Sequence, residues 1–363
     1  MRVIISGGGT GGHVFPAIAI ANALKEQEPT IDIRFVGAKG KLEMEKVPKA
    51  GYPIEGLWIS GFHRQLTLRN LLFPFKLLSS LWKAFWIVRR FRPQAAVGVG
   101  GYASGPTLGV ASRMGIPCLL QEQNSYAGVT NKLLAAKARR ICVAYEGMER
   151  YFPSSKIVMT GNPVRQDILQ LEGKRTTALK HFGFAPGKKT LLVFGGSLGA
   201  RTLNQAMAAS AAALEAAEEV QVLWQAGKLY IEEYQQTATA ALPNVQIRAF
   251  IDRMDLAYAM ADAVVCRAGA LTISELCLAA KPAILVPSPN VAEDHQTHNA
   301  MALVKKEAAI MVKDVQAKAE MVPQALALLK DAGQQEALSE HIRQLGRAEA
   351  AKKIAAEVLQ LMK

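Results

Sequence analysis

Five glycines and one histidine near the start of the chain have the composition of an anion-binding turn that carries a titratable group. They occupy residues 6–13 (SGGGTGGH), after a short β-branched segment that predicts a strand. The segment that follows, 17–24, has the composition of a helix. Amides at the start of a helix attract anions, and glycine lets a phosphate approach them. We therefore expect an anion at this turn, with His13 beside it.

Two nucleotide-binding motifs resemble this turn in part. The glycines of 7–12 have the spacing of the dinucleotide fingerprint, which also requires an acid at the end of the next strand for the adenosine ribose. The predicted strand 31–36 is followed by Gly-Ala-Lys and has no such acid. The turn also lacks the Gly-Lys-Ser/Thr of a P-loop. For His13 itself, the alternative is a helix-capping residue without chemistry.

A stretch in the second half, residues 263–275 (AVVCRAGALTISE), has the pattern of a strand, a small-residue turn and a helix. The start of that helix again favours a phosphate. Glu275 falls about one turn into the helix, where its carboxylate can accept hydrogen bonds from both hydroxyls of a ribose. Ser197, in the glycine turn of 195–200, can donate to the same phosphates. These residues predict a nucleotide diphosphate site.

Other polar residues also follow predicted strands. Residues 97–106 form a third glycine-rich turn, in which Ser104 is placed to cap the next helix. Residues 121–124 (QEQN) form a polar cluster, whose Glu122 and Asn124 either line a site or hydrogen-bond within the loop. His295 and His298 lie three residues apart, but no third ligand is evident. We therefore predict no metal site.

Composition narrows the class of protein. The chain has 363 residues, 50% of them hydrophobic, which predicts two domains with large cores. Its four cysteines have no metal-ligand spacing, which suits a reducing cytoplasm. A strand predicted from residue 2 leaves no room for a signal peptide, and no uncharged apolar run reaches the about 18 residues of a spanning helix. The net charge is +13, and residues 56–121 contain eight Lys or Arg and no acid, so we expect this block to face an anion.

Strand-like runs alternate with helical patterns along the chain, which predicts an α/β fold with parallel sheets. Strands are predicted near 2–6, 31–36, 53–59, 95–99, 117–121, 140–144 and 157–160. Pro163 marks a boundary, after which residues 190–201 repeat the strand and glycine turn of the N-terminus, followed by a helix at 202–217. The carboxyl ends of the strands of two such domains would face a cleft. The last 30 residues are also predicted to be helical.

Residues 64–92 combine basic and aromatic side chains. Lys76, Lys83 and Arg90 recur every seven residues and so share one helix face. A face suited to the core holds Leu77, Leu81, Phe85 and Val88. More aromatic residues remain than one buried stripe requires: Phe73, Phe75, Trp82 and Trp86. We expect this helix to lie in the headgroup region of an anionic membrane. A single-stranded nucleic acid, or a core helix with a solvated basic edge, is the alternative.

Taken together, six motifs resemble the MurG family of bacterial N-acetylglucosaminyltransferases. They run in order over nearly the whole chain: GGTGGHVFP at 8–16, GGYxSGP at 100–106, EQN at 122–124, GNPVR at 161–165, GGSxGA at 195–200 and RxGALTxSE at 267–275. The resemblance implies a GT-B fold, in which two Rossmann-like domains with parallel sheets face each other across a cleft. The acceptor domain would be residues 1–163 and the donor domain 164–344, with a helix at about 345–363 packed back on the first.

The resemblance also implies the reaction. N-acetylglucosamine (GlcNAc) would pass from UDP-GlcNAc to the 4-hydroxyl of N-acetylmuramic acid (MurNAc) in undecaprenyl-pyrophosphoryl-MurNAc-pentapeptide (lipid I). The anomeric centre would be inverted, giving a β-1,4 link, and no cofactor or nucleic acid would be needed. The protein would lie peripherally on the cytoplasmic face of the inner membrane.

The expected site residues fall into three sets: donor contacts carried over by motif, an acceptor set, and a membrane-facing set that rests on the basic and aromatic residues of 64–92. Donor contacts are expected at Thr10, Gly11, Gly12, Asn124, Arg165, Ser197, Ile251, Ala270, Leu271, Thr272, Ile273, Ser274, Glu275 and Gln296. Ile251 would act through its backbone, at the strand end 250–252, against the uracil edge. The acceptor set is Gly9, Gly101, Tyr102 and Ser104. The membrane-facing set is Phe73, Phe75, Lys76, Trp82, Lys83, Trp86 and Arg90. The family commonly has two polar residues at 295–296; here they are His-Gln, and Gln296 is assigned to the donor.

Inverting transfer needs a base for the acceptor hydroxyl and stabilisation of the departing diphosphate. No Asp-x-Asp metal clamp is present in the donor half, so helix N-termini, Ser197 and Arg165 would carry that charge. His13 is the expected base or acceptor-orienting group, and Glu122 is the competing candidate. Three other functions are compatible with the donor motifs: another GT-B enzyme such as a diacylglycerol glycosyltransferase, a UDP-sugar epimerase, and a sugar-nucleotide-binding regulator without activity.

Overall fold

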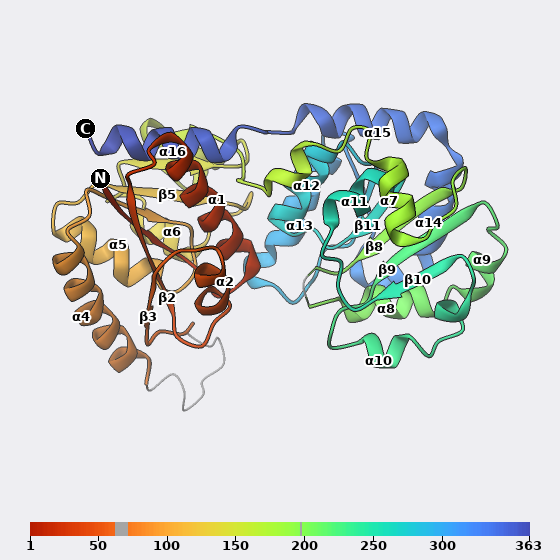
Figure 1. Cartoon of the computed structure of the whole chain (residues 1–363), viewed down its shortest axis with the longest axis horizontal. Helices are drawn as coiled ribbons and strands as arrows, with labels where there is room; N and C mark the ends of the chain where they lie inside the picture. The colour runs from red at the N-terminus through yellow and green to blue at the C-terminus, as the bar shows by residue number, and fades with distance from the viewer. Residues whose placement is uncertain (62–71, 197) are drawn as a thin grey trace. The chain divides into compact units, whose positions relative to one another are not determined.

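A computed structural model of the chain describes residues 1–61, 72–196 and 198–363. The chain divides into two compact units, each with one parallel sheet (Figure 1). The first unit comprises Met1–Val164 and Ala348–Lys363, and the second comprises Arg165–Arg347. The predicted α/β class, with two domains each built on a parallel sheet, is confirmed.

The first unit is built on a seven-stranded parallel sheet with the order β3-β2-β1-β4-β5-β6-β7. Its strands are β1 (Arg2–Ser6), β2 (Asp32–Ala38), β3 (Ile54–Leu57), β4 (Ala95–Gly98), β5 (Cys118–Glu122), β6 (Arg140–Val143) and β7 (Ile157–Met159). All seven lie where the sequence predicts strands, with ends that differ by up to two residues. The runs are apolar because helices cover both faces of the sheet.

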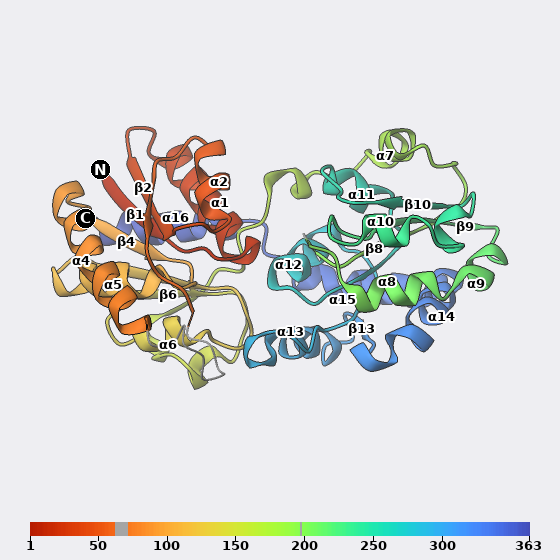
Figure 2. The same ribbon diagram turned by 90° about the horizontal axis from the view of Figure 1, so that it is seen from below.

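Successive side chains of β1 point to opposite faces, each covered by its own helices. Val3 and Ile5 pack with α1 (Gly11–Gln27) and α16 (Ala350–Leu361), whereas Ile4 packs with α4 (Phe73–Phe91). The second layer also contains α5 (Ser104–Arg113) and α6 (Val129–Leu134), and Figure 2 shows these two across the strands from α1. A short helix, α2 (Glu43–Lys49), and the 3₁₀ turns Met148–Arg150 and Ser154–Lys156 complete the unit.

The last helix, α16, belongs to the first unit although the chain reaches it from the second. Ile354, Ala355 and Val358 are fully buried in the core beside α1. Gln27 Nε2, at the end of α1, donates to the carbonyl of Lys352 in α16 at 2.9 Å. The apolar face of α16 is therefore covered by the N-terminal sheet layer.

The second unit repeats this topology with six strands, in the order β10-β9-β8-β11-β12-β13. The strands are β8 (Lys189–Phe194), β9 (Val220–Gln225), β10 (Val245–Arg248), β11 (Ala263–Cys266), β12 (Ala283–Leu285) and β13 (Ile310–Met311). In both units the strand order reverses beside the first strand, between β1 and β4 and between β8 and β11. Ligands of open α/β sheets bind at such switch points, outside the carboxyl ends of the strands.

Nine α-helices and four 3₁₀ turns are described in the second unit. The α-helices are α7 (Arg175–Phe182), α8 (Arg201–Ala208), α9 (Ala211–Glu215), α10 (Ile231–Tyr234), α11 (Met254–Met260), α12 (Ala270–Ala279), α13 (His295–Val304), α14 (Ala317–Lys330) and α15 (Ala332–Gln344). The 3₁₀ turns are Gln166–Leu169, Thr239–Ala241, Ala292–Asp294 and Asp314–Gln316. Trp224 lies fully buried against α8, where its indole N–H donates to Asn204 at 3.0 Å.

The continuous helix predicted at 202–217 is wrong, because the structure divides it into α8 and α9. Ser210 Oγ donates to the Ala206 carbonyl, and Thr239 Oγ1 donates to the carbonyls of Met207 and Ala208. Those last two carbonyls would otherwise accept the next helical amides. The Met207 carbonyl also accepts from the Ser210 amide three residues on, at 3.1 Å, so the regular α-helical hydrogen bonding ends at this point.

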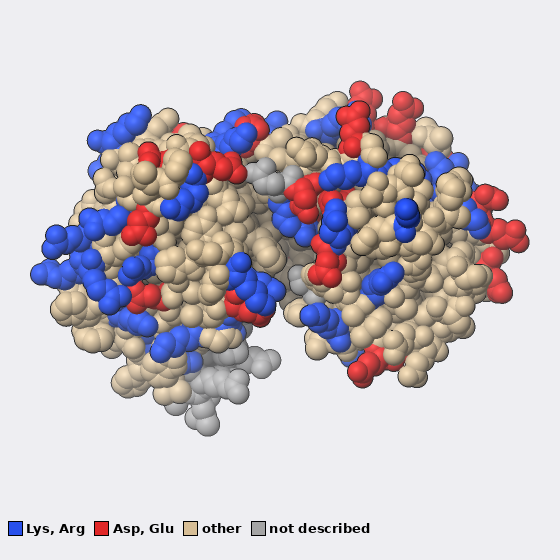
Figure 3. Space-filling model, in the orientation of Figure 1, with Lys and Arg blue, Asp and Glu red and all other residues tan. Residues whose placement is uncertain are grey.

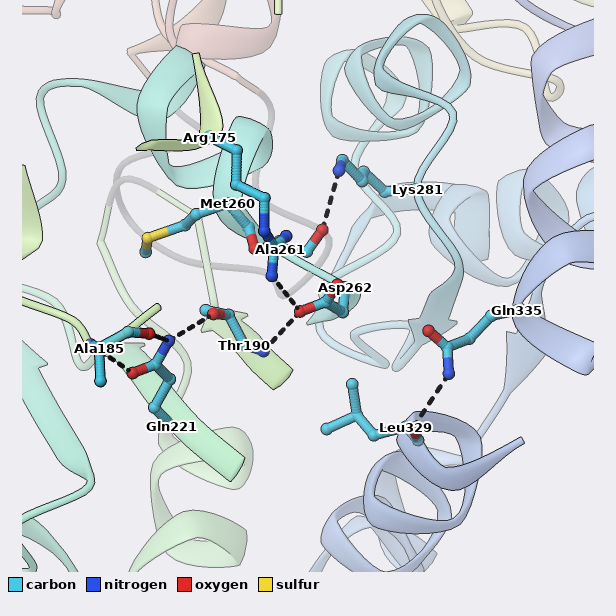
Figure 4. A network of polar contacts seen from close by, with 10 residues as sticks. All are labelled: Arg175, Ala185, Thr190, Gln221, Met260, Ala261, Asp262, Lys281, Leu329 and Gln335. Carbon is cyan, nitrogen blue, oxygen red and sulfur yellow. Dashed lines mark hydrogen bonds and ion pairs between the residues drawn. The ribbon is translucent and has the colours of Figure 1, made fainter. Parts of the chain in front are cut away.

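The amino ends of the strands in the second unit are joined by a polar network (Figure 4). Asp262 accepts from the Thr190 amide at 2.7 Å and from Arg175 Nη2 at 3.0 Å. Beside it, Lys281 Nζ donates to the Ala261 carbonyl at 2.8 Å, and burial lowers the pKa of this lysine to about 8. This network lies at the edge opposite the glycine turn that follows β8.

Candidate active site

Two glycine turns interlock at the switch point of the first unit. One follows β1 and the other, at Gly100 and Gly101, follows β4. A Cβ on Gly101 would lie 2.3 Å from the Gly8 carbonyl oxygen, and a Cβ on Gly7 would lie 2.0 Å from Val99. Gly101 also has a φ of +83°, which L-residues rarely adopt. Both turns therefore require glycine in order to pack against each other.

His13 lies in the first turn of α1, against the second glycine turn. A Cβ on Gly100 would come within 2.8 Å of His13 Nε2, so the imidazole rests directly on the Gly100 backbone. Its Nδ1 is 3.2 Å from Thr10 Oγ1, a hydrogen-bond distance. Thr10 is the N-cap residue of α1, is exposed, and is followed by the half-buried Gly11 and the exposed Gly12. The structure thus brings His13, Thr10 and both glycine turns together.

Two residues of the predicted acceptor set, Ser104 and Gly9, hydrogen-bond to other groups of the first unit. Ser104 is fully buried and donates from Oγ to the carbonyls of Ser6 at 2.7 Å and Gly100 at 2.9 Å. The prediction that it caps α5 is wrong, because the N-cap residue is Ala103. The Gly9 amide, predicted to face the acceptor, donates to Glu43. Tyr102 remains half exposed and packs its ring against Gly61.

Glu122 is poorly placed to act as a base. It is 1% exposed, and its two oxygens accept from the Asn124 amide at 3.1 Å, the Gly128 amide at 2.9 Å and Asn131 Nδ2 at 2.8 Å. Burial raises the pKa of Glu122, an effect that these hydrogen bonds oppose. The carboxylate therefore organises the loop after β5, which leaves Asn124 half-buried at the same edge. Loop hydrogen bonding, the alternative left open by the sequence, describes Glu122 better than catalysis.

The glycine turn of the second unit follows β8. A Cβ on Gly199 would lie 2.0 Å from the Ala226 carbonyl oxygen, which fixes this turn against the end of β9. Gln225 Nε2 donates to the Gly196 carbonyl at 2.8 Å from the same side. Ser197 lies outside the described residues, and the neighbouring Leu198 is exposed.

The predicted donor segment 270–275 forms the first turns of α12, beyond the carboxyl end of β11. Ala270, Leu271, Thr272 and Ser274 are partly exposed, whereas the Ile273 side chain is buried. Only the backbone of Ile273 could thus meet a ligand. Ser274 Oγ donates to the Ala270 carbonyl at 3.0 Å. The start of α12 therefore presents backbone amides and small side chains at the switch point.

Glu275 and Arg165, both predicted donor contacts, bind each other. Arg165 Nε and Nη2 each lie 3.2 Å from Glu275 Oε1, and the Tyr258 hydroxyl donates to Oε2 at 3.1 Å. Glu275 is 8% exposed; burial raises its pKa, and Arg165 opposes that shift. A carboxylate has about four acceptor positions, so the described contacts leave room for one ribose hydroxyl and not for the predicted two. Tyr258 was missed because it is 17 residues away in sequence.

The remaining donor residues lie after β10 and β12. β10 ends at Arg248, so Ile251 follows the strand instead of ending it, and its buried side chain leaves only its backbone for a ligand. Gln296 lies in the first turn of α13, where its Oε1 accepts from the Ser288 amide at 2.9 Å. Arg267, which the motif contains, ties β11 to the β12 loop by donating to the carbonyls of Val286 and Pro287.

One face of α4 exposes a row of aromatic side chains. Trp82 is 69% exposed, Phe75 65% and Trp86 50%, and Phe73 is half-buried. Phe85 is also exposed, so its predicted place in the core is wrong. The buried face consists of Ser80, Ala84, Ile87, Val88 and Phe91, with Leu77 and Leu81 partly buried beside it. Residues 64–71 of the predicted block lie outside the described residues.

The three cations of α4 that the prediction places toward a membrane also have partners within the first unit. Lys76 Nζ donates to Ser60 Oγ at 3.0 Å, Lys83 Nζ donates to the Gly56 carbonyl at 2.8 Å, and Arg90 pairs with Glu55 at 2.9 Å. All three thus reach toward β3 and the segment after it, where acceptors are available. In Figure 3, Lys and Arg side chains still gather over the side of the first unit that α4 and α5 cover.

Neither a metal site nor a membrane span emerges from the part of the chain that the structure describes. Within those ranges no three His, Cys, Asp or Glu side chains are grouped as metal ligands. No helix among them combines the length and apolarity needed to cross a bilayer.

Two family models match this chain. The glycosyltransferase family 28 N-terminal domain matches residues 3–143, and the glycosyltransferase family 28 C-terminal domain matches residues 190–358. A protein of Bacteroides fragilis is 56% identical over 363 residues, covering 99% of this chain and 96% of that protein. A protein of Flavobacterium psychrophilum is 54% identical over 361 residues, covering 99% and 98%. Both are named UDP-N-acetylglucosamine–N-acetylmuramyl-(pentapeptide) pyrophosphoryl-undecaprenol N-acetylglucosamine transferase.

Solved structures agree with these relatives. MurG of Acinetobacter baumannii is 30% identical with a TM-score of 0.79, and the match covers 99% of each chain. The UDP-GlcNAc 2-epimerase of Neisseria meningitidis, bound to UDP-GlcNAc, has a TM-score of 0.66 at 13% identity, covering 99% of this chain and 100% of that one. At that identity the second likeness establishes a shared fold alone.

Proposed function

Since the chain belongs to glycosyltransferase family 28, and within it to the MurG family, we propose that it transfers GlcNAc from UDP-GlcNAc to the MurNAc 4-hydroxyl of lipid I. The product is the complete lipid-linked precursor of peptidoglycan. The observation that carries the proposal is the pair of switch points with different chemistry. One presents an imidazole, and the other presents a helix start beside a buried carboxylate.

The donor binds the second unit in this proposal. The start of α12 offers amides and a positive dipole end to the diphosphate. Glu275 accepts a hydrogen bond from the ribose, and Arg165, held at 3.2 Å from that carboxylate, faces the charge of the departing UDP. Ser197, Ile251 and Gln296 complete the proposed donor set. Thr10, Gly11, Gly12 and Asn124, on the first unit, remain predicted donor contacts.

The acceptor binds the first unit, and His13 removes the proton from its hydroxyl. When Nδ1 carries a hydrogen and donates to Thr10 Oγ1, Nε2 is the ring nitrogen that would take up that proton. The deprotonated oxygen attacks the anomeric carbon of GlcNAc, the bond from that carbon to the UDP oxygen breaks, and the configuration inverts. Gly101 and Tyr102 remain proposed acceptor contacts, whereas the buried Ser104 supports the turns.

We further propose that the first unit rests on the anionic cytoplasmic face of the inner membrane through the aromatic face of α4. Amphipathic helices with exposed aromatic residues bind the headgroup region. Since Lys76, Lys83 and Arg90 have partners on the β3 side, the aromatic residues supply most of the binding energy of this helix. A lipid acceptor fits this surface better than a soluble one, which disfavours an epimerase or a sugar-nucleotide regulator.

The direct test is incubation with radiolabelled UDP-GlcNAc and lipid I, with and without EDTA. Label should move to the lipid in both cases, and UDP-GlcNAc should remain unchanged when lipid I is omitted. Isomerisation of UDP-GlcNAc without lipid would instead indicate an epimerase. Label transfer to diacylglycerol in place of lipid I would indicate a different GT-B transferase.

The role of His13 has its own test. The variant His13→Ala should lower kcat by about 10²- to 10⁴-fold, the usual contribution of a general base. The affinity for UDP-GlcNAc should change less than about threefold, because the imidazole does not hold the donor in this proposal. Equal losses of kcat and donor affinity would reduce His13 to a structural role.

A further inference from the structure

Glu43 lies directly beneath the glycine turn of the first unit, and no sequence motif pointed to it. It is the first residue of α2 and is 1% exposed. Its Oε2 accepts from the Gly9 amide at 2.8 Å, and its Oε1 accepts from the Ala38 amide at 2.9 Å. A single side chain therefore ties the glycine turn to the end of β2.

The surrounding backbone is shaped around this carboxyl group. A Cβ on Gly8 would lie 2.2 Å from Glu43 Cδ, and a Cβ on Gly37 would lie 2.5 Å from Glu43 Cγ. Two glycines on different strand ends thus leave the space that the side chain fills. Because the group is buried, both oxygens need donors, and the two amides supply them.

The contact continues from Glu43 to the imidazole through two consecutive residues. Gly9 is held by the carboxylate, and the next residue, Thr10, is the N-cap of α1 with its Oγ1 3.2 Å from His13 Nδ1. Gly9 has a φ of +91° and lacks a side chain, so this segment depends on outside contacts to keep its conformation.

We propose that Glu43 is a positioning residue for the transfer reaction, which sets the place and orientation of His13 through Gly9 and Thr10. This inference rests on the proposed role of His13 as the base. In this inference the Gly9 amide donates to Glu43 and not to an anionic ligand. A displacement of about 1 Å in a reacting group can lower the rate about 100-fold. Because Glu43 fixes the position of this turn, we expect its replacement to lower kcat.

The main test is Glu43→Gln, which keeps the volume of the side chain. Glutamine has one acceptor oxygen, and its amide N–H groups would meet either Gly9 or Ala38 as donor against donor. We expect kcat to fall at least about tenfold and the KM for UDP-GlcNAc to change by a smaller factor, because the donor contacts proposed at Thr10, Gly11 and Gly12 lie on the same segment. The control is Glu45→Gln on the same helix, whose exposed carboxylate pairs with Lys49 and should leave both constants unchanged. Thermal unfolding verifies that both variants are folded.

Histidine NMR provides a readout that does not depend on activity. In isotope-labelled protein, Glu43→Gln should shift the imidazole signals of His13, assigned as those missing from His13→Ala, and should leave the other histidine signals in place. Glu45→Gln should shift none. Thr10→Val, at an exposed position, should shift the same signals and lower kcat even if Glu43→Gln does not fold.

A double-mutant cycle tests whether Glu43 acts through His13. In the His13→Ala background, Glu43→Gln should lower kcat by no more than about twofold, because the group that it positions is absent. A full additional loss, or unmoved His13 signals in Glu43→Gln, would overturn the inference. If His13→Ala keeps the wild-type kcat, the base assignment fails, and the NMR comparison still decides whether Glu43 positions the ring.

Discussion

Replacement of Glu275 by glutamine tests whether this carboxylate holds the ribose of the donor. Arg165 uses two acceptor positions on Oε1, and Tyr258 uses one on Oε2. Of about four positions on a carboxylate, one is left for a ribose hydroxyl. A hydrogen bond to an ionised group contributes about 1.5–3 kcal/mol, which corresponds to about 13- to 160-fold in affinity.

The expected result follows from that single hydrogen bond. In Glu275→Gln the KM for UDP-GlcNAc should rise about 30-fold, within this range, while kcat should fall by a smaller factor, because Arg165 loses its ion pair but keeps an amide oxygen as acceptor. Initial rates at saturating lipid I give both constants, and calorimetric titration with UDP measures the affinity without turnover. The matched control is Glu232→Gln on α10, which is exposed and should change neither. A fall in kcat with unchanged UDP affinity would refute the ribose assignment.

The same carboxylate predicts a pH dependence of donor binding. Burial raises the pKa of Glu275, although Arg165 opposes the shift. Since the ionised form accepts the ribose hydroxyl, UDP affinity should weaken as the pH falls through this raised value, earlier than for an ordinary carboxyl group. The UDP affinity of Glu275→Gln should lack this step, and an identical step in the variant would assign it to another group.

Three further predictions concern groups outside the donor site. Glu122→Gln should lower the free energy of unfolding by about 1–3 kcal/mol and keep kcat within about tenfold; a loss above about 1,000-fold at unchanged stability would make Glu122 the base. Replacing Trp82 and Trp86 by serine should weaken binding to anionic vesicles at least about tenfold in a sedimentation assay, and more than Lys83→Met does; the reverse order would refute aromatic insertion. Burial lowers the pKa of Lys281 to about 8, so the folded state releases a proton that the unfolded chain keeps up to its ordinary pKa. Between pH 8 and 10, the free energy of unfolding of the wild type, measured by denaturant titration, should therefore rise relative to that of Lys281→Met by about 1.4 kcal/mol per pH unit. A constant difference between the two proteins across this range would contradict the lowered pKa.

Local sequence patterns determined the strands, the turns and the repeat between the two units. Apolar β-branched runs predict buried parallel strands, and the glycine-rich stretches 7–12 and 195–200 mark turns. The predicted transfer reaction depended on the same motifs, because each motif places several groups on one turn. These features need contacts only between near neighbours in the chain.

Tertiary structure decided which groups meet across long distances in sequence. Glu43 reaches Gly9, 34 residues away, and Tyr258 reaches Glu275; neither pairing has a local signal. The Gly56 carbonyl that accepts from Lys83 and the loop donors around Glu122 likewise have no local signal in the sequence. The resemblance already implied a C-terminal helix on the first domain, but only the folded chain decided that α16 packs beside α1, because an amphipathic helix can cover any apolar face of matching shape. Sequence thus determined where chemistry is available, and the fold determined which charged groups are already occupied by internal hydrogen bonds.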